Sequence, residues 1–197
     1  MENSRLWKDM EFIVELDKMK SIFRETSIIG EDRREDDAQH SWHISLMAVI
    51  LAEYSDEKIE LLKVIKMLLI HDLVEIFAGD TFCYDEKGNE DKRERELEAA
   101  EKIFGMLDED KGRELRALWD EFEEIETPEA KFATAMDRFQ PMLSNYHNNG
   151  GTWKKYGIKQ SDIYKRIEPV QQTSQEIWKY VEYIIEDAFD KGLIKER

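Results

Sequence analysis

The stretch LLKVIKMLLIHDLVEIFAGD, residues 61–80, decides how the rest of the chain must fold. Most of it is apolar on every side, which is typical of a helix in the centre of a protein. Its last part nevertheless carries ionisable side chains at His71, Asp72, Glu75 and Asp80. Unpaired charges are costly in an apolar interior, so buried ionisable groups are normally paired or bind a metal. We therefore expect a core helix with a metal site at its C-terminal end.

The composition is that of a helical protein. The 197 residues are 41 % apolar and 38 % charged, with nine glycines and three prolines. This length fits one domain with a substantial core. We expect an all-α fold that forms a single helical domain over residues 1–197, with a motif-bearing core at about 24–141 and a C-terminal helical region at 159–191.

Charge and cysteine content exclude several classes of function. A formal net charge of −16 repels polyanions, so we expect no nucleic-acid polymer as a partner, although a metal and a few arginines could hold a small phosphorylated ligand. Cys83 is the single cysteine, which excludes an intramolecular disulfide and a thiolate metal cluster. No N-terminal apolar run resembles a signal peptide, and the longest apolar stretch is too short to cross a bilayer. We expect a cytoplasmic protein with no membrane partner.

Helical periodicity and turn residues divide the chain into segments. Helices are expected over about 7–23, 38–54, 61–77, 90–107, 110–124, 128–146 and 160–191, the last interrupted near Pro169. Loops are expected over about 26–37, 78–88 and 147–157. Asp36 or Asp37 is expected to cap the second helix and Asp56 the third, while Thr127 and Pro128 start the sixth.

One combination of residues carries the chemistry. His40 points inward from the first turn of the second helix, and adjacent His71 and Asp72 lie in the apolar run of the third. Glu75 follows at i+4 from His71, so it can face the same cavity. A lone His-Asp pair is weak evidence, because it arises often by chance. Two imidazoles with two carboxylates, however, suit a divalent first-row metal with positions open for water and substrate.

Three motifs occur in the order that is found in a known superfamily: RREDDAQHSWH at 33–43, LLIHDLVEIFAGD at 68–80 and AMDRFQP at 135–141. In these motifs the chain resembles the HD-domain metal-dependent phosphohydrolases. Within that superfamily it resembles the small single-domain branch that includes the bacterial 5′-deoxynucleotidases. The resemblance spans residues 24–141.

The resemblance implies that four side chains ligate one divalent metal ion per chain: His40, His71, Asp72 and Asp137. From the residues alone, Asp120 or Glu123 could equally be the fourth ligand. Only two further histidines, His43 and His147, are available as additional ligands, so a site with one metal ion is expected rather than one with two. Mn²⁺, Co²⁺, Fe²⁺, Ni²⁺ and Zn²⁺ all suit such a site, and Mg²⁺ suits it less well.

The resemblance also implies roles for acidic and basic residues. Glu75 and Asp80 match the residues that hold and activate water in such enzymes. Arg24 is similar in placement to an arginine that binds the substrate phosphate, and Arg33 and Arg34 compete with it for that role.

The expected function is hydrolysis of a nucleoside 5′-monophosphate, in particular a deoxynucleotide, to nucleoside and phosphate. Two alternatives stay open: hydrolysis of another phosphate ester or nucleotide polyphosphate, including guanosine tetraphosphate, and a nucleotide-sensing protein without turnover. The presence of every expected ligand and acidic residue favours catalysis. The resemblance further suggests a homodimer, for which the amphipathic helices at both ends of the chain could supply the interface.

Overall fold

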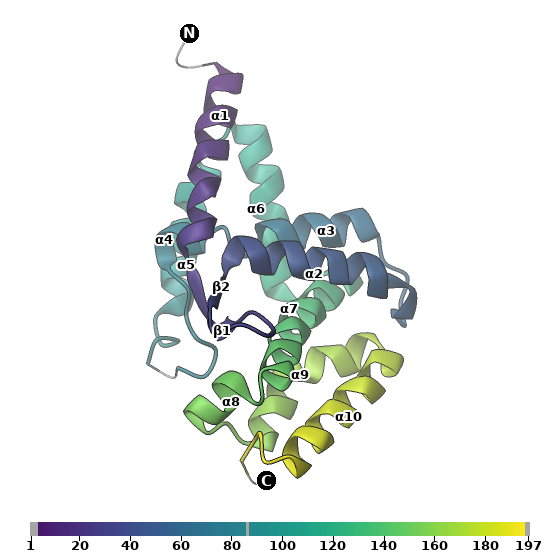
Figure 1. The fold of residues 1–197 in the computed structure, drawn as a ribbon. Coiled ribbons are helices and arrows are strands. Elements are labelled where there is room, and N and C mark those ends of the chain that lie inside the picture. The colour runs from purple at the N-terminus through teal and green to yellow at the C-terminus, as the bar shows by residue number, and fades with distance from the viewer. Residues whose placement is uncertain (1–3, 86, 196–197) are drawn as a thin grey trace.

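The computed structural model describes residues 4–85 and 87–195, and the expected all-α architecture is confirmed. Helices and one small antiparallel hairpin follow one another along the chain (Figure 1): α1 (Arg5–Glu15), the 3₁₀ helix η1 (Leu16–Ser21), β1 (Phe23–Ser27), β2 (Arg34–Asp36), α2 (Asp37–Leu51), the 3₁₀ helix η2 (Ala52–Tyr54), α3 (Leu61–Ile70), α4 (Glu75–Ala78), α5 (Lys92–Phe104), α6 (Glu109–Glu124), α7 (Pro128–His147), α8 (Gly151–Tyr156), α9 (Gln160–Thr173) and α10 (Gln175–Asp190). No described helix is both long and apolar enough to cross a membrane.

Helix α7 is the centre of the molecule. It packs against α2, α3, α6, α8, α9 and β1, and Phe132, Ala133 and Met136 on it are fully buried. The expected start is confirmed: the hydroxyl of Thr127 accepts a hydrogen bond from the Ala130 N–H, and proline occupies the first turn.

The apolar core consists of two clusters. The larger one surrounds α7 and includes side chains of α2, α3, α9 and α10. The smaller one joins the end of α3 to α5 and α6, around the fully buried Trp119. Met67 and Leu68 belong to the first cluster, and Leu73 and Val74 to the second. The segment between them, which carries His71 and Asp72, therefore lies where the two clusters meet.

The expectation of one continuous helix over 61–77 is wrong. Regular α-helix ends at Ile70, and a turn precedes the short α4. Across the turn the backbone changes to i→i−3 hydrogen bonds, from Leu73 N–H to the Ile70 carbonyl and from Glu75 N–H to the Asp72 carbonyl. This tighter winding places residues i and i+3 directly above one another. Asp72 and Glu75 consequently lie on the same side of the chain.

The polar segment 26–37 is a hairpin with an ordered start to the next helix, not only a loop. Strands β1 and β2 pair antiparallel, with Phe23 opposite Asp36 and Ser27 opposite Arg34. Of the two expected caps, Asp36 is the one that begins α2: its carboxylate accepts from the Gln39 N–H, while the Gln39 side chain accepts from the Asp36 N–H.

Other expected boundaries also need correction. The first helix ends at Glu15 and continues as a 3₁₀ turn. Asp56 does not cap α3, because its carboxylate accepts the Gln175 N–H at 3.0 Å instead. The segment 147–157, expected as a loop, contains α8. The C-terminal helical region breaks at Ser174, whose hydroxyl caps α10, while Pro169 lies within α9.

Candidate metal centre

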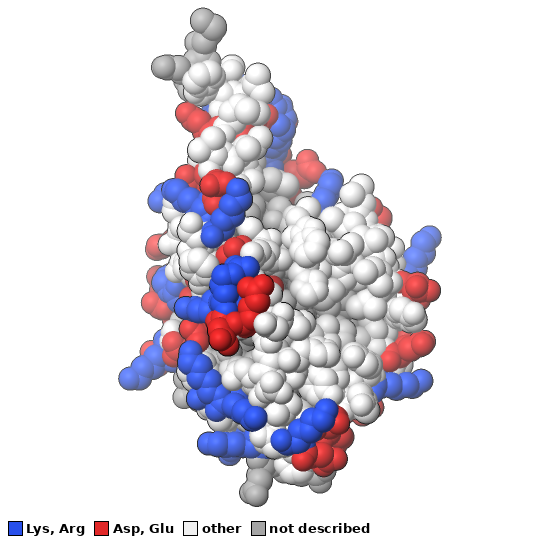
Figure 2. All heavy atoms as spheres, in the orientation of Figure 1, with Lys and Arg blue, Asp and Glu red and all other residues white. Residues whose placement is uncertain are grey.

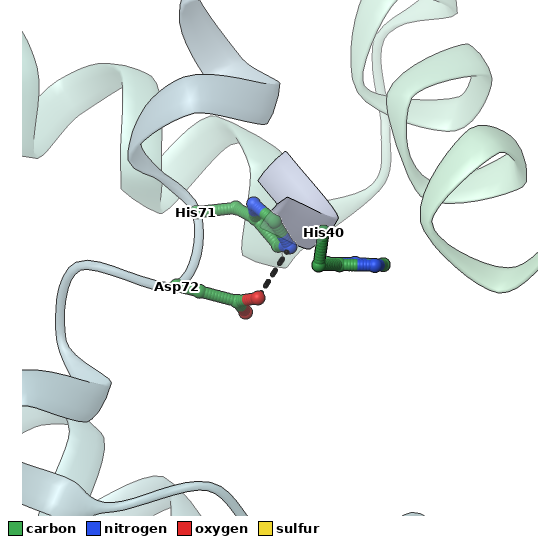
Figure 3. A group of neighbouring side chains, drawn as sticks. All are labelled: His40, His71 and Asp72. Atoms are coloured by element: carbon green, nitrogen blue, oxygen red, sulfur yellow. Dashed lines mark ion pairs between the residues drawn. The ribbon is translucent and has the colours of Figure 1, made fainter. Parts of the chain in front are cut away.

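Four side chains meet at the junction of the two core clusters: His40, His71, Asp72 and Asp137. His40 lies in the first turn of α2, His71 and Asp72 follow the end of α3, and Asp137 lies near the middle of α7. His71 Nε2 is 3.0 Å from Asp72 Oδ2 and 3.6 Å from Asp137 Oδ1, while His40 Nε2 is 3.1 Å from the same Asp137 oxygen. Figure 3 shows the contact between His71 and Asp72, with the His40 side chain beside it.

Hydrogen bonds on the far side of each ring orient the two imidazoles. His71 Nδ1 lies 2.9 Å from the Leu68 carbonyl oxygen, so this nitrogen carries the proton and donates it. His40 Nδ1 lies 3.1 Å from Gln140 Oε1, and Gln140 in turn donates to Glu35 at 2.9 Å. Both Nε2 atoms thereby face Asp137, where each can bind a proton or, in its place, a metal ion. Metal-binding histidines are commonly held in this way by their other ring nitrogen.

The donor atoms fit a metal ion. His71 Nε2 is buried, and it makes no hydrogen bond to any described residue. Ligand atoms of His40, His71 and Asp72 lie within 4.8 Å of one another. Donors that share one ion at about 2.1 Å lie about 3.0 to 3.4 Å apart, close to the 3.1 and 3.6 Å that separate His40 Nε2 and His71 Nε2 from Asp137 Oδ1. Two nitrogens and two carboxylate oxygens in this arrangement can hold a divalent cation.

The charges at the site also favour the binding of a cation. Burial lowers the pKa of His71, but the carboxylates of Asp72 and Asp137 outweigh it and raise this pKa to about 10. Burial raises the pKa values of both aspartates, yet the adjacent imidazoles hold them below their usual range. A site that attracts protons so strongly also attracts metal cations, which compete with protons for the same ligand atoms.

Further carboxylates surround the four ligands. Burial, together with the charges of Asp72 and Asp37, raises the pKa of Glu75 well above its ordinary value, and Glu75 Oε2 is buried without a hydrogen-bond partner among the described residues. Asp80 lines the same cavity, and burial also raises its pKa. Both residues expected to handle water are therefore beside the metal ligands.

Asp37 is a site residue that the sequence reasoning missed. It is fully buried, and its carboxylate lies within 4.8 Å of ligand atoms of Asp72 and Glu75. Burial and the charge of Asp72 raise its pKa to about 7. It was considered only as a helix cap, but its position three residues before His40 places it on the same side of α2.

Of the three arginines expected to compete for phosphate, the structure brings only Arg24 to the site. Arg24 Nη1 lies 2.7 Å from Asp72 Oδ2 and 3.4 Å from Asp37 Oδ1. Arg34 donates instead to the Phe23 carbonyl on the exposed side of the hairpin. Arg33 bonds Gln39 and is likewise exposed. Neither of these two side chains lines the cavity.

The other candidate ligands lie elsewhere. Asp120 accepts a hydrogen bond from Arg116, and Glu123 one from Arg93. His43 contacts Gln140 rather than the ligand group, and His147 is exposed. Of the three acids considered as a fourth ligand, Asp137 is the one that contacts both His40 and His71.

A cavity opens from the metal ligands toward the C-terminal half of the chain. Its walls come from β1, the α3–α4 turn, the loop that follows α4, and helices α7, α8 and α9. Arg138, Trp153 and Arg166 are part of this lining. The sequence alone does not indicate a site role for Arg138 or Arg166, because no local motif links α9 to residues more than ninety positions earlier (residues 72 and 166).

Comparison with known proteins gives a consistent result. The sequence profile of the HD domain family matches residues 16–178. A protein from Magnetospirillum magnetotacticum, described as a predicted metal-dependent phosphohydrolase, has a similar structure with a TM-score of 0.93 and 45 % identity, over 98 % of this chain and 97 % of that one. A Pyrococcus horikoshii protein shares the fold, with a TM-score of 0.63 and 23 % identity over 92 % of this chain and 99 % of that one.

Sequence relatives named 5′-deoxynucleotidase HDDC2 also match. The human protein is 32 % identical over 56 % of this chain and 53 % of its own length. The Dictyostelium discoideum protein is 29 % identical over 70 % of this chain and 75 % of its own length. The chain therefore spans about half the length of the human relative.

Proposed function

The chain belongs to the HD domain family, and we propose that it is a metal-dependent phosphohydrolase that converts deoxynucleoside 5′-monophosphates to nucleoside and phosphate. The observation that carries this proposal is the convergence of His40, His71, Asp72 and Asp137 beside Glu75, whose buried Oε2 atom has no hydrogen-bond partner among the described residues. The names of the Magnetospirillum and HDDC2 proteins support the reaction class and the substrate class.

Each residue has a role in this reaction. His40, His71, Asp72 and Asp137 would hold a divalent cation, which would supply Lewis acidity for the phosphate and for water. Glu75, with Asp80, orients the attacking water and accepts its proton. Arg24 donates to a phosphate oxygen and stabilises the charge of the transition state. The bond from phosphorus to the 5′-oxygen breaks, and the nucleoside leaves after that oxygen gains a proton.

Imidazole ligands favour certain metals. Mn²⁺, Co²⁺, Fe²⁺, Ni²⁺ and Zn²⁺ accept a ligand set of two imidazoles and two carboxylates more readily than Mg²⁺, which prefers oxygen ligands and retained water. We propose one ion of this group per chain.

A substrate panel tests the proposal. The purified protein is analysed for metal content and then assayed for phosphate release from deoxynucleotides, ribonucleotides, guanosine tetraphosphate and simple phosphate esters, with each metal in turn. We expect the fastest release from a deoxynucleoside 5′-monophosphate. Preference for the tetraphosphate would contradict the substrate class, and binding of nucleotides without release in any metal would contradict catalysis.

We also propose that the chain forms a homodimer through the outer face of α2. Figure 2 shows a broad face almost free of charged side chains, which lies over α2 in the view of Figure 1. Trp42, Leu46, Val49 and Ile50 are exposed there, Trp42 to 64 %. Each copy carries a formal charge of −16, so two copies repel one another. This repulsion is smallest where the facing surfaces are uncharged, and an exposed apolar face is typical of an interface. The expected cytoplasmic location stays a prediction.

Placing a charge on this face tests the dimer. Ile50→Glu should shift the protein from dimer to monomer, because burying an unpaired carboxylate at an interface is strongly unfavourable. Sedimentation equilibrium measures the change, with Arg113→Glu on the exposed side of α6 as the control for added negative charge. A wild-type monomer, or an Ile50→Glu protein that still dimerises with unchanged affinity, would contradict the proposed interface.

A further inference from the structure

Arg166 on α9 lies beside Asp137, although it is outside the motifs at 33–43, 68–80 and 135–141. Its Nη2 atom lies 3.9 Å from Asp137 Oδ2. The other oxygen of the same carboxylate, Oδ1, faces His40, His71 and Arg24, whose Nη2 lies at 3.9 Å. Asp137 therefore lies between two guanidinium groups. Arg24 on β1 approaches its Oδ1 atom, and Arg166 on α9 approaches its Oδ2 atom.

The guanidinium of Arg166 is free to bind a ligand. A separation of 3.9 Å exceeds a hydrogen bond, and the structure gives its side chain no other ion pair within the described ranges 4–85 and 87–195. The side chain is 39 % exposed and lines the cavity. Arg24 differs in this respect, because it is 14 % exposed and bonds Asp72 at 2.7 Å.

The neighbouring Arg138 adds a second positive charge to this wall of the cavity. Arg138 Nη1 donates to the backbone carbonyl of Arg166 at 3.3 Å, and Arg138 Nε is buried with no hydrogen-bond partner in the described part of the chain. Two guanidinium groups on adjacent helices repel one another, and a bound anion removes that repulsion.

We propose that Arg166 binds the phosphate of the substrate and forms, with Arg24, a clamp of two guanidinium groups around the group that is hydrolysed. The inference rests on the proposed phosphohydrolase function and extends it to a residue outside the 24–141 motif region. Arginine suits this role because its planar group donates two parallel hydrogen bonds to phosphate oxygens. Arg138 is a positioning residue, since it fixes the backbone of α9 at Arg166.

Binding of inorganic phosphate to the full-length, Mn²⁺-loaded protein tests the proposal without relying on turnover. Arg166→Gln should weaken phosphate binding, measured by calorimetry, by roughly 10- to 100-fold, the value of a charge-assisted hydrogen bond. Arg166→Lys should recover part of this loss, because it restores the charge without the planar fork. Lys165→Gln, at the adjacent exposed position of α9, is the matched control and should bind phosphate like the wild type.

A second ligand separates a phosphate contact from a general disturbance of the cavity. Deoxyadenosine, which has no phosphate, should bind wild type and Arg166→Gln equally, and both proteins should hold the same amount of manganese. Unchanged phosphate affinity in Arg166→Gln, equal weakening for both ligands, or no phosphate binding to the wild type would overturn the proposal. If phosphate binds as expected but no nucleotide is hydrolysed, the proposed function fails while the Arg166 contact stands.

Discussion

Glu75 is a buried carboxylate at the edge of the candidate metal site. It is 6 % exposed, its Oε2 atom has no hydrogen-bond partner in the described structure, and burial beside Asp72 raises its pKa. A carboxylate held in this way has a strong tendency to take a proton, which is the property that a general base needs.

Replacing Glu75 with Gln should abolish most turnover while the metal stays bound. The amide has nearly the same shape but cannot accept a proton, so kcat should fall roughly 10²- to 10⁴-fold. Phosphate release gives the rate, and elemental analysis gives the metal content. Glu90→Gln, at an exposed position of the loop before α5, should behave like the wild type. An active Glu75→Gln enzyme would show that another group accepts the proton.

The residue types, more than their spacing, indicated which side chains to expect at the candidate site. His40, His71, Asp72 and Asp137 are polar groups in apolar surroundings, and the structure brings them together as the resemblance implied. The choice among Arg24, Arg33 and Arg34 could not be made in the same way. All three belong to or flank the β1–β2 hairpin, and only the folded hairpin determines which side chain turns inward.

At the scale of elements, the end of α3 is the feature that shapes the site. Trp119 on α6 is fully buried, and its indole N–H donates to the His71 carbonyl at 3.1 Å. This bond satisfies one of the carbonyl groups that a helix leaves without a partner at its C-terminus. The smaller core cluster thereby fixes the turn that carries the ligands.

Trp119→Phe should lower the free energy of unfolding by more than the smaller volume of the phenylalanine side chain explains. The change leaves the buried His71 carbonyl without its donor, which costs about 1 to 3 kcal/mol in addition to the smaller ring. Urea unfolding measures the difference. Trp178→Phe is the matched control, because Trp178 is also buried but its indole makes no hydrogen bond in the described structure. Equal destabilisation of the two variants would contradict a role for the indole bond.

The break in α3 could not be read from periodicity. A helix that is apolar on every side has no polar face whose phase could shift at a break, so 61–77 resembles one continuous helix. The start of α7 was predictable for the opposite reason, since Thr127 and Pro128 specify a helix start by local chemistry. The helix α8 was missed because its sequence begins in a pair of glycines.

For the whole molecule, the buried charges link stability to pH in the metal-free state. The pKa of His71 is raised from 6.5 to about 10, so the stabilisation from its protonated ring is complete below 6.5 and is lost as pH rises toward 10. The pKa of Asp37 is raised from 3.8 to about 7, so its neutral form loses its advantage as pH rises through this range. Both effects destabilise the metal-free protein at higher pH.

The metal-free protein should therefore melt at a lower temperature at pH 8.5 than at pH 6. Adding Mn²⁺ or Zn²⁺ should raise the melting temperature, and the gain should be larger at pH 8.5, where fewer protons compete for the ligands. Differential scanning calorimetry after chelator treatment measures both. His147→Gln, at an exposed histidine, should leave the pH dependence unchanged. A metal-induced gain that is greatest at pH 6 would contradict this linkage.

Three residues within a single turn of α7 have different structural roles, and this restricts insertions and deletions in the helix. Asp137 faces the metal ligands, Arg138 holds the backbone at Arg166, and Gln140 orients His40. Inserting one amino acid earlier in the helix would rotate all three by about 100° at once. Point substitutions can alter these tasks separately, whereas insertions and deletions cannot. We therefore expect length variation among descendants of this gene to be absent from α7.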